Sequence, residues 1–242
     1  MPPRTLPLRP AATATTALAG LLLAACGRPD GDTSLFPLDG GHRWTYRVQT
    51  ERDDDSRERE QLELRSDGRA DLDGRPAWLR RSSSGALYWL RSDASGIYRV
   101  ASRHETEAEP EPDPQPRYVL KAPFTPGTQW QAPTTAYLLQ RRNEFPREIR
   151  HSHPSVTMSY RIEATGLRVQ TPAGDFDGCL RVQGTATVRL FADPTAGWKD
   201  LPLTTTEWYC PGVGLVKLER DEPASSAFLS GGRLTMELSA WQ

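Results

Sequence analysis

The sequence lacks the features by which most enzymes and nucleic-acid-binding proteins are identified. Its formal net charge is only −1, which excludes binding of nucleic acid through bulk charge. Serine never occurs in a G-x-S-x-G motif, and no glycine-rich loop precedes a helical pattern that would cradle phosphate. We therefore expect a protein that is not an enzyme and that uses no cofactor.

Histidine is also scarce, with four residues in the whole chain. Only His151 and His153 lie close together, and Pro154 directly after them predicts a solvated loop rather than a metal-binding strand. Acidic residues cluster at 53–60 and 105–113, in segments that we expect to be exposed, whereas paired catalytic carboxylates usually need one buried partner. The sequence thus predicts neither a metal site nor a catalytic residue.

Long hydrophobic runs are absent except near the N-terminus. Residues 11–25 carry no charge, follow the basic residues Arg4 and Arg9, and end in a leucine- and alanine-rich stretch. As a helix this run would span roughly 22 Å, less than the ~30 Å hydrocarbon core of a bilayer. We therefore interpret residues 1–25 as a signal helix that is cleaved, not as a membrane span.

The apolar run stops at Leu23-Ala24-Ala25-Cys26, which resembles the lipobox of bacterial lipoproteins. This resemblance implies cleavage before Cys26 and lipidation of Cys26 with diacylglyceryl and palmitate-type chains, which anchor a protein to a membrane. Gly27 stands where an aspartate commonly retains Gram-negative lipoproteins at the inner membrane, so the resemblance implies an outer-membrane location facing the periplasm. A secretory signal with a chance cysteine is the alternative.

Helical periodicity is nearly absent after the signal, and alternation of apolar and polar residues takes its place. This period of two is typical of antiparallel strands with one buried face, and it is clearest at 42–50, 158–164, 179–190 and 233–241. We predict a mainly β fold, a curved antiparallel sheet or half-barrel of about ten to twelve strands. Residues 26–34 would form the lipidated N-terminus and a short tether, and residues 35–242 a single β domain.

An acidic, proline-rich segment at 104–117 interrupts the alternation. Proline cannot donate to a sheet ladder and neighbouring acidic residues repel one another, so we predict an extended, solvated loop. A calcium site or a partner-docking site is the alternative reading of these acidic residues.

Two segments on either side of this loop begin alike. "FPLDGGHRW" at 36–44 and "APFTPGTQW" at 122–130 align without a gap and share a proline, a glycine and a final tryptophan. Proline stiffens the approach, glycine permits a turn, and tryptophan begins a strand that faces the core. The pair suggests two β-sheet halves that open in the same way.

Three blocks of the chain resemble a loosely defined group of bacterial lipoproteins and secreted proteins. The blocks are "FPLDGGHRWTYRV", "TPAGDFDGCLRV" and "EWYCPGVGLVKLE". Most members of the group have no assigned activity, and their sheets are similar to the curved half-barrel of the outer-membrane lipoprotein-carrier family. The acidic proline-rich loop is not part of that pattern.

Two cysteines, Cys179 and Cys210, remain once Cys26 is assigned to lipid. An even pair in an oxidising compartment predicts a disulfide, with two free thiols or a metal pair as alternatives. The resembling proteins often carry alanine at position 210, so a cysteine there also suggests a bond to Cys179. We then expect the strand at 179–191 to lie antiparallel beside the strand at 204–210, or to pack near it, with 192–202 as the connecting loop.

The concave face of such a sheet would be available to a lipid or another apolar ligand. The candidate residues for this face are aromatic, and a place in the ordinary core is the alternative for each: Trp44, Tyr46, Trp89, Tyr98, Trp130, Tyr160 and Trp208. The function predicted is therefore a membrane-anchored, non-enzymatic binding or envelope-structural module. A periplasmic hydrolase whose site is assembled from loops is the alternative.

Overall fold

The computed structural model describes residue 1 and residues 34–193, 195, 197–224 and 227–242. The chain divides into one unit spanning Met1–Gly31 and another spanning Asp32–Gln242. The predicted signal helix, the lipidation site Cys26 and the tether up to residue 33 lie outside the described residues. The fold below is that of the second unit.

Almost all of this unit is β-structure, with one short 3₁₀ helix, η1, at Ile149–His151. The strands are β1 Arg43–Arg52, β2 Arg57–Leu72, β3 Arg75–Ser82, β4 Leu87–Asp93, β5 Gly96–Arg103, β6 Glu111–Lys121, β7 Gln129–Thr134, β8 Gln140–Arg141, β9 Val156–Thr171, β10 Gly174–Asp193, β11 Gly197–Cys210, β12 Gly214–Glu222, β13 Leu229–Ser230 and β14 Gly232–Trp241.

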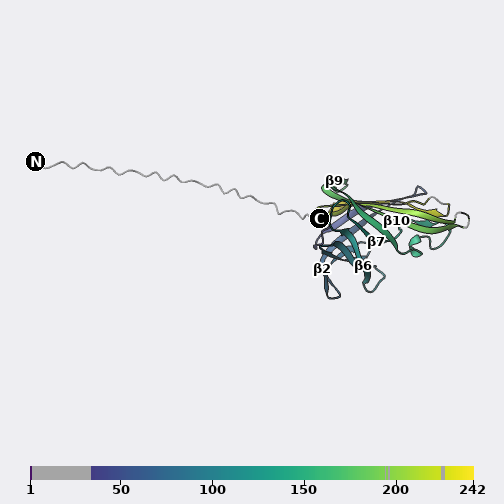
Figure 1. Ribbon diagram of the computed structural model, residues 1–242, viewed down its shortest axis with the longest axis horizontal. Helices are drawn as coiled ribbons and strands as arrows, with labels where there is room; N and C mark the ends of the chain where they lie inside the picture. Colours follow the sequence, from purple (N-terminus) through teal and green to yellow (C-terminus); the bar gives the residue numbers. More distant parts are fainter. Residues whose placement is uncertain (2–33, 194, 196, 225–226) are drawn as a thin grey trace. The chain divides into compact units, whose positions relative to one another are not determined.

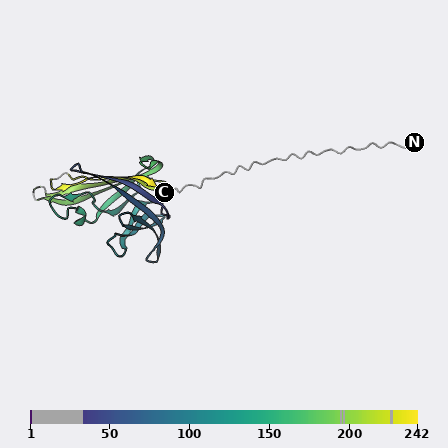
Figure 2. The same ribbon diagram turned by 180° about the vertical axis from the view of Figure 1, so that it is seen from behind.

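Twelve of these strands form one antiparallel sheet in the order β6-β5-β4-β3-β2-β1-β14-β12-β11-β10-β9-β7, and β8 pairs with β13 separately. The first half of the chain, blue to teal, and the second half, green to yellow, form the two sides of the curved sheet (Figures 1 and 2). The two edge strands, β6 and β7, come into contact without pairing as strands. The predicted mainly β, curved antiparallel fold is confirmed.

The alternation seen in β1 places three apolar side chains on the inner face of the sheet. Trp44, Tyr46 and Val48 are all buried, and they belong to one core cluster with residues of β12 and β14. The indole Nε1 of Trp44 donates to the carbonyl of Val213 at 2.7 Å, and the hydroxyl of Tyr46 donates to that of Leu215 at 2.8 Å. These bonds satisfy the polar atoms of two large side chains that would otherwise be buried at a cost.

The two segments that begin alike, each with a glycine three residues before a tryptophan, have the same backbone conformation at that glycine. Gly41 adopts a φ of 97° and Gly127 a φ of 96°, a region that favours glycine. Each glycine is followed, three residues later, by a tryptophan that is buried in a strand, Trp44 in β1 and Trp130 in β7. The two halves nevertheless belong to one continuous sheet, because β1 pairs with β14.

The acidic, proline-rich segment corrects one expectation. Residues 104–110 form a loop as predicted, but residues 111–117 belong to the edge strand β6. An edge strand tolerates proline because one side of it needs no ladder hydrogen bonds. Pairing with β5 is interrupted between Pro112 and Arg117, where prolines recur at every second position.

The connection between β10 and β11 is also shorter than expected. Strand β10 continues to Asp193 and β11 begins at Gly197, so most of the predicted loop at 192–202 is strand. The two strands pair antiparallel from Leu180↔Tyr209 to Asp193↔Gly197. Long neighbouring strands satisfy backbone donors and acceptors that a loop would leave to solvent.

Candidate ligand cavity

The curved sheet forms an open cavity of about 270 Å³. Its lining comes from the segment before β1, from β1 to β6, and from β9, β11 and β12, so strands distant in sequence meet around it. The lining residues are Phe36, Tyr46, Leu64, Arg80, Tyr88, Leu90, Arg99, Arg117, Tyr118, Val119, Tyr160, Glu207, Tyr209 and Leu215. Its volume is near the lower end of the ~300–1,000 Å³ typical of small-molecule sites.

Most of the lining is aromatic or aliphatic. Tyr160 of β9 stacks on Trp130 of β7, with ring centroids 5.5 Å apart, and this contact orients its ring. Phe36 packs near Tyr209, at 6.3 Å between centroids. Such walls favour an apolar ligand body, because each apolar surface that leaves water on binding contributes about 25 cal/mol per Å².

Four charged residues, Arg80, Arg99, Arg117 and Glu207, interrupt this apolar lining, and Arg80 is the most unusual of them. It lies on β3, directly opposite Tyr88 of β4, and only 8% of the residue is exposed. Its guanidinium lies between the rings of Phe36 and Trp44, 4.0 and 4.4 Å from their centroids. These cation–π contacts hold the charge in an otherwise apolar environment.

The guanidinium of Arg80 is poorly compensated. One nitrogen, Nη2, donates to the carbonyl of Pro37 at 2.7 Å, while Nε is buried without a hydrogen-bond partner. Burial lowers the pKa of Arg80 to about 10, and among the described residues no carboxylate forms an ion pair with it. A buried cation without a carboxylate is costly, which makes Arg80 the least expected residue of the cavity.

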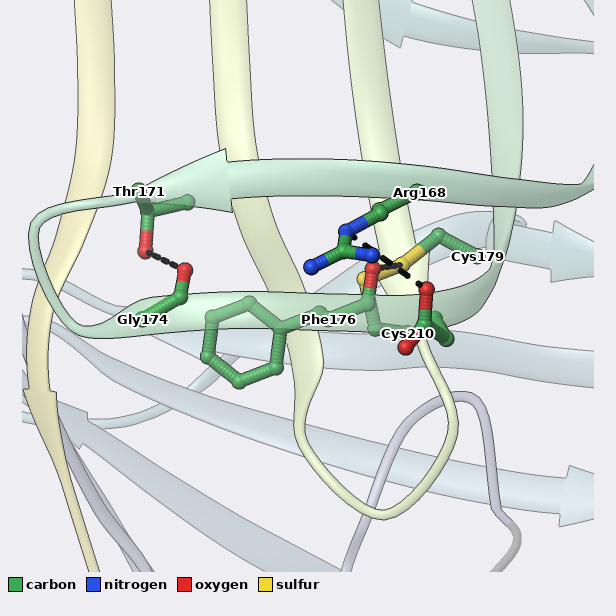
Figure 3. Close-up of a disulfide and its surroundings, with 7 residues drawn as sticks. Arg168, Thr171, Gly174, Phe176, Cys179 and Cys210 are labelled. Carbon is green, nitrogen blue, oxygen red and sulfur yellow. Dashed lines mark hydrogen bonds and ion pairs between the residues drawn. A yellow bond between two sulfur atoms is a disulfide. The ribbon is translucent and has the colours of Figure 1, made fainter.

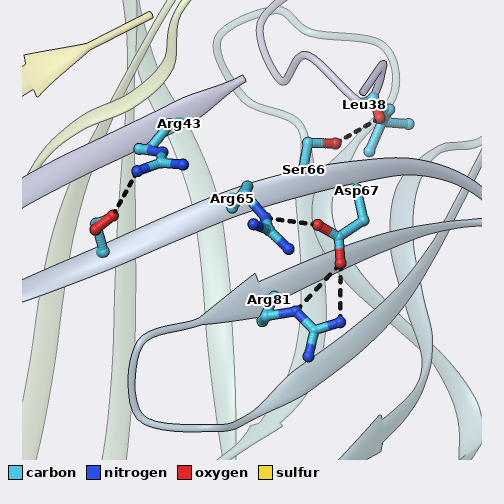
Figure 4. A network of polar contacts seen from close by, with 7 residues as sticks. Leu38, Arg43, Arg65, Ser66, Asp67 and Arg81 are labelled. Carbon is cyan, nitrogen blue, oxygen red and sulfur yellow. Dashed lines mark hydrogen bonds and ion pairs between the residues drawn. The ribbon is translucent and has the colours of Figure 1, made fainter. Parts of the chain in front are cut away.

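The segment that carries Phe36 is fixed by two polar side chains from the sheet. Ser66 of β2 donates to the carbonyl of Leu38 at 2.8 Å, as Figure 4 shows, and Arg80 donates to the carbonyl of Pro37. Asp67, the next residue on β2, joins Arg65 and Arg81 across the outer surface (Figure 4). Hydrogen bonds to the adjacent carbonyls of Pro37 and Leu38 therefore hold this wall of the cavity in place.

Glu207 and Tyr209 of β11 form a second polar group in the lining. The Tyr209 hydroxyl donates to Glu207 Oε2 at 2.5 Å. Burial raises the pKa of Glu207 above its ordinary value, and burial also raises the pKa of Tyr209. Both shifts favour the neutral forms, so Glu207 opposes a bound anion less than an exposed glutamate would.

A larger cleft of about 560 Å³ lies beside the cavity and shares Tyr88, Arg99 and Arg117 with it. Residues of β6 and β7 both line this cleft, which places it at the unpaired seam of the sheet. Arg99 is neutralised there by Asp113, with nitrogen–oxygen distances of 2.7 and 2.6 Å. The cleft and the cavity thus share part of their walls at this seam.

The cavity contains two of the seven aromatic residues proposed from the sequence, Tyr46 and Tyr160. The other five do not line it. Trp44 lies behind Arg80, Trp130 behind Tyr160, and Trp89 belongs to a separate cluster with Ala77, Leu87 and Ala101. Tyr98 hydrogen-bonds Asp93 at an exposed position, and Trp208 lies beneath the ammonium group of Lys217.

The sequence pattern of β4 does not show which of its side chains face the cavity. The segment "LYWL" carries large apolar residues on both faces of the strand, so a period of two does not show which face is concave. Tyr88 and Leu90 face the cavity, and Trp89 does not. Arg80 had no sequence signal either, because its neighbour Arg81 makes the pair look like a solvated face.

The disulfide joins Cys179 and Cys210, whose Cα atoms are 4.1 Å apart (Figure 3). Both residues are buried, and the antiparallel register of β10 and β11 brings them together, as expected. Arg168 lies nearby (Figure 3). It forms an ion pair with Asp175 at 2.7 Å across the β9–β10 hairpin. The bond thus joins adjacent strands within the core cluster that contains Trp44.

The histidine pair lies away from the cavity. His151 ends η1 and His153 lies in the following loop, as expected for a solvated segment. In the described part of the chain no group of three or more His, Cys, Asp or Glu residues is arranged to hold a metal ion. Over the same residues, none of the helices has the length and apolar character needed to span a bilayer.

Comparison with known proteins identifies no family. No family model matches the chain, and no curated protein matches it. Two solved structures are similar in fold: an exported protein with a YmcC-like fold from Bacteroides fragilis and a protein described as a lipoprotein from Parabacteroides distasonis.

Both similarities are distant. The Bacteroides fragilis structure has a TM-score of 0.42 and 14% identity, over 88% of this chain and 99% of that one. The Parabacteroides distasonis structure has a TM-score of 0.40 and 14% identity, over 87% and 99%. At these values neither structure bears on the function of this chain.

Proposed function

We propose that this protein is a lipid-anchored lipoprotein of the bacterial envelope that binds an apolar small molecule inside its curved sheet. The observation that carries the proposal is the cavity of about 270 Å³, whose walls are mostly aromatic and aliphatic. Among the described lining residues there is no serine, cysteine, histidine or threonine, and the carboxylate of Glu207 already accepts a hydrogen bond from the Tyr209 hydroxyl. The lining therefore favours binding over the hydrolase alternative.

The anchor in this proposal is Cys26, and the location is the outer membrane, facing the periplasm. Support comes from Leu23-Ala24-Ala25-Cys26 and from the absence of aspartate at position 27. In cells fed an alkyne-labelled palmitate analogue, the wild-type chain should become labelled and fractionate with outer membranes, and Cys26→Ser should do neither. Labelling of the Cys26→Ser variant would contradict the anchor, and wild-type protein in inner-membrane fractions would contradict the sorting.

Ligand binding can be tested on residues 32–242, which form a compact unit with their own core. N-phenyl-1-naphthylamine, a neutral apolar fluorophore, should bind this protein with one-to-one stoichiometry and a blue-shifted emission. Leu64 lines the cavity and is only partly buried, so Leu64→Trp should reduce the volume without overpacking the core. We expect this variant to weaken probe binding about tenfold or more.

The matched control is Leu62→Trp, two residues earlier on the same strand and outside the cavity lining. It should bind the probe like the wild type. Equal loss in both variants would locate the probe elsewhere, and a wild-type protein that does not bind the probe at all would contradict the proposed function.

A further inference from the structure

Arg80 is a cationic group inside an apolar cavity, and the described residues around it leave its charge without a carboxylate. Among the described residues, the guanidinium lies over the rings of Phe36 and Trp44 and donates to the carbonyl of Pro37. One nitrogen, Nε, has no acceptor. A protein that needed only to fill this space would be served by an aliphatic side chain, because an uncompensated buried charge is destabilising.

We propose that the ligand of the cavity is an amphiphile with an acidic head group, a carboxylate or a phosphate, and that Arg80 binds this head group. The inference rests on the proposed function and names the chemical class of its ligand. The planar guanidinium matches both kinds of oxyanion, and a charge-assisted pair is strongest where water is excluded. The aromatic and aliphatic walls would enclose the apolar tail of the same molecule.

The charges around the cavity agree with an anionic ligand. Arg117 lines both the cavity and the outer cleft, and it makes no ion pair with a carboxylate of the described residues. Arg99 also lines both the cavity and the cleft, and it is already paired with Asp113. An acidic amphiphile in the cavity would thus have a second arginine, Arg117, in the lining around it, although Arg117 also acts electrostatically on Glu207.

Glu207 is the only carboxylate in the lining of the cavity, as far as the structure describes it. It accepts a hydrogen bond from Tyr209, and its burial favours the protonated form. Burial thus makes the negative charge of Glu207 less favourable than that of an exposed glutamate, which reduces its repulsion of an acidic head group.

The test compares three ligands with the same tail: dodecanoate, dodecyl phosphate and dodecanol. Each is titrated at neutral pH against N-phenyl-1-naphthylamine bound to residues 32–242. We expect at least one of the two acids to compete about tenfold more strongly than the alcohol, as expected for a charge-assisted hydrogen bond that the alcohol lacks. Comparison of dodecanoate with dodecyl phosphate then shows which head group the site prefers.

The variants place this preference on Arg80. Arg80→Met keeps the approximate volume and removes the charge, so the acids should lose their advantage while dodecanol stays within about twofold of its wild-type affinity. Arg80→Lys keeps a cation without the planar fork and should retain part of the preference. The control is Arg47→Met, on the solvent-exposed face of β1, which should change none of the three affinities.

The outcomes separate this inference from the function on which it rests. If the probe binds but dodecanol competes as well as the acids, the acidic-ligand inference is wrong and the apolar site stands. If Arg80→Met weakens all three ligands equally and lowers the melting temperature, Arg80 is a structural residue and the inference is again overturned. If Arg80→Met does not fold, Arg80→Gln removes the charge with a polar side chain, and an unchanged acid preference in Arg80→Gln overturns the inference.

Discussion

Glu222, at the end of β12, is fully buried, and its carboxylate accepts four hydrogen bonds. Oε1 accepts from the backbone N–H of Tyr137 at 3.0 Å and from Nε of Arg220 at 2.5 Å. Oε2 accepts from the backbone N–H groups of Leu138 and Leu139, at 2.7 and 3.1 Å. One side chain thus fixes the segment between β7 and β8, and this segment helps to line the cleft at the seam.

The substitution Glu222→Gln tests this arrangement, because it preserves the shape and replaces one oxygen by an NH₂ group. In either orientation of the amide, two donors then face a donor instead of an acceptor. A hydrogen bond to a charged group contributes about 1.5–3 kcal/mol, and breaking a buried ion pair from one side costs about 3–5 kcal/mol. We expect Glu222→Gln to lower the free energy of unfolding by about 3–5 kcal/mol.

Urea denaturation of residues 32–242, followed by tryptophan fluorescence, measures this loss. With an m-value of about 2–3 kcal/mol per M, the midpoint should fall by roughly 1–2.5 M. The control is Glu219→Gln on the same strand, whose carboxylate pairs with Lys217 at 3.0 Å in a partly exposed position. That pair should contribute less than about 1 kcal/mol. If the two variants lose the same stability, the four bonds of Glu222 do not hold the segment as argued.

Two further predictions concern β10. Replacing both Cys179 and Cys210 by alanine opens a loop with a sequence separation of 31 residues, and the chain-entropy relation gives a loss of ~3.7 kcal/mol. Urea denaturation checks the value, and two thiols titrating in the denatured, non-reduced wild type would show that no bond forms. Gly184→Ala would place a Cβ atom 2.6 Å from a side-chain atom of Thr205 and 2.9 Å from the ring of Tyr160. It should cost about 1–3 kcal/mol and weaken binding of the fluorescent probe; an unchanged midpoint and an unchanged affinity would contradict this contact.

The sequence alone determined that the sheet is antiparallel with one buried face, and it also determined several turns and buried positions. Alternation in "HRWTYRVQT" places Trp44 and Tyr46 on one face, and both are buried in β1. A period of two is a local property of the strand, so it can be read without knowledge of the neighbours. The glycines at 41 and 127 are local in the same sense, since a positive φ depends on the residue itself.

Two other features, the disulfide and the proline-rich segment, depended partly on the local sequence and partly on the tertiary structure. The count of cysteines predicted the bond between Cys179 and Cys210, but only the register of β10 and β11 brings the two side chains together. The prolines of 111–117 predicted a loop, yet the position of β6 at the edge of the sheet permits them in a strand. In that case the neighbours of a residue decided its structure, not its propensity.

The cavity was decided by tertiary structure alone. Arg80 lines it because β3 pairs with β4 in a register that sets Arg80 opposite Tyr88, and because the sheet curves until β11 stands across from them. No pattern along a single strand contains that information. When a strand carries large residues on both faces, as β4 does with Tyr88 and Trp89, only pairing and curvature select the concave side. The charge of Arg80 and the apolar walls around it come from distant parts of the sequence, and folding alone brings them into one site.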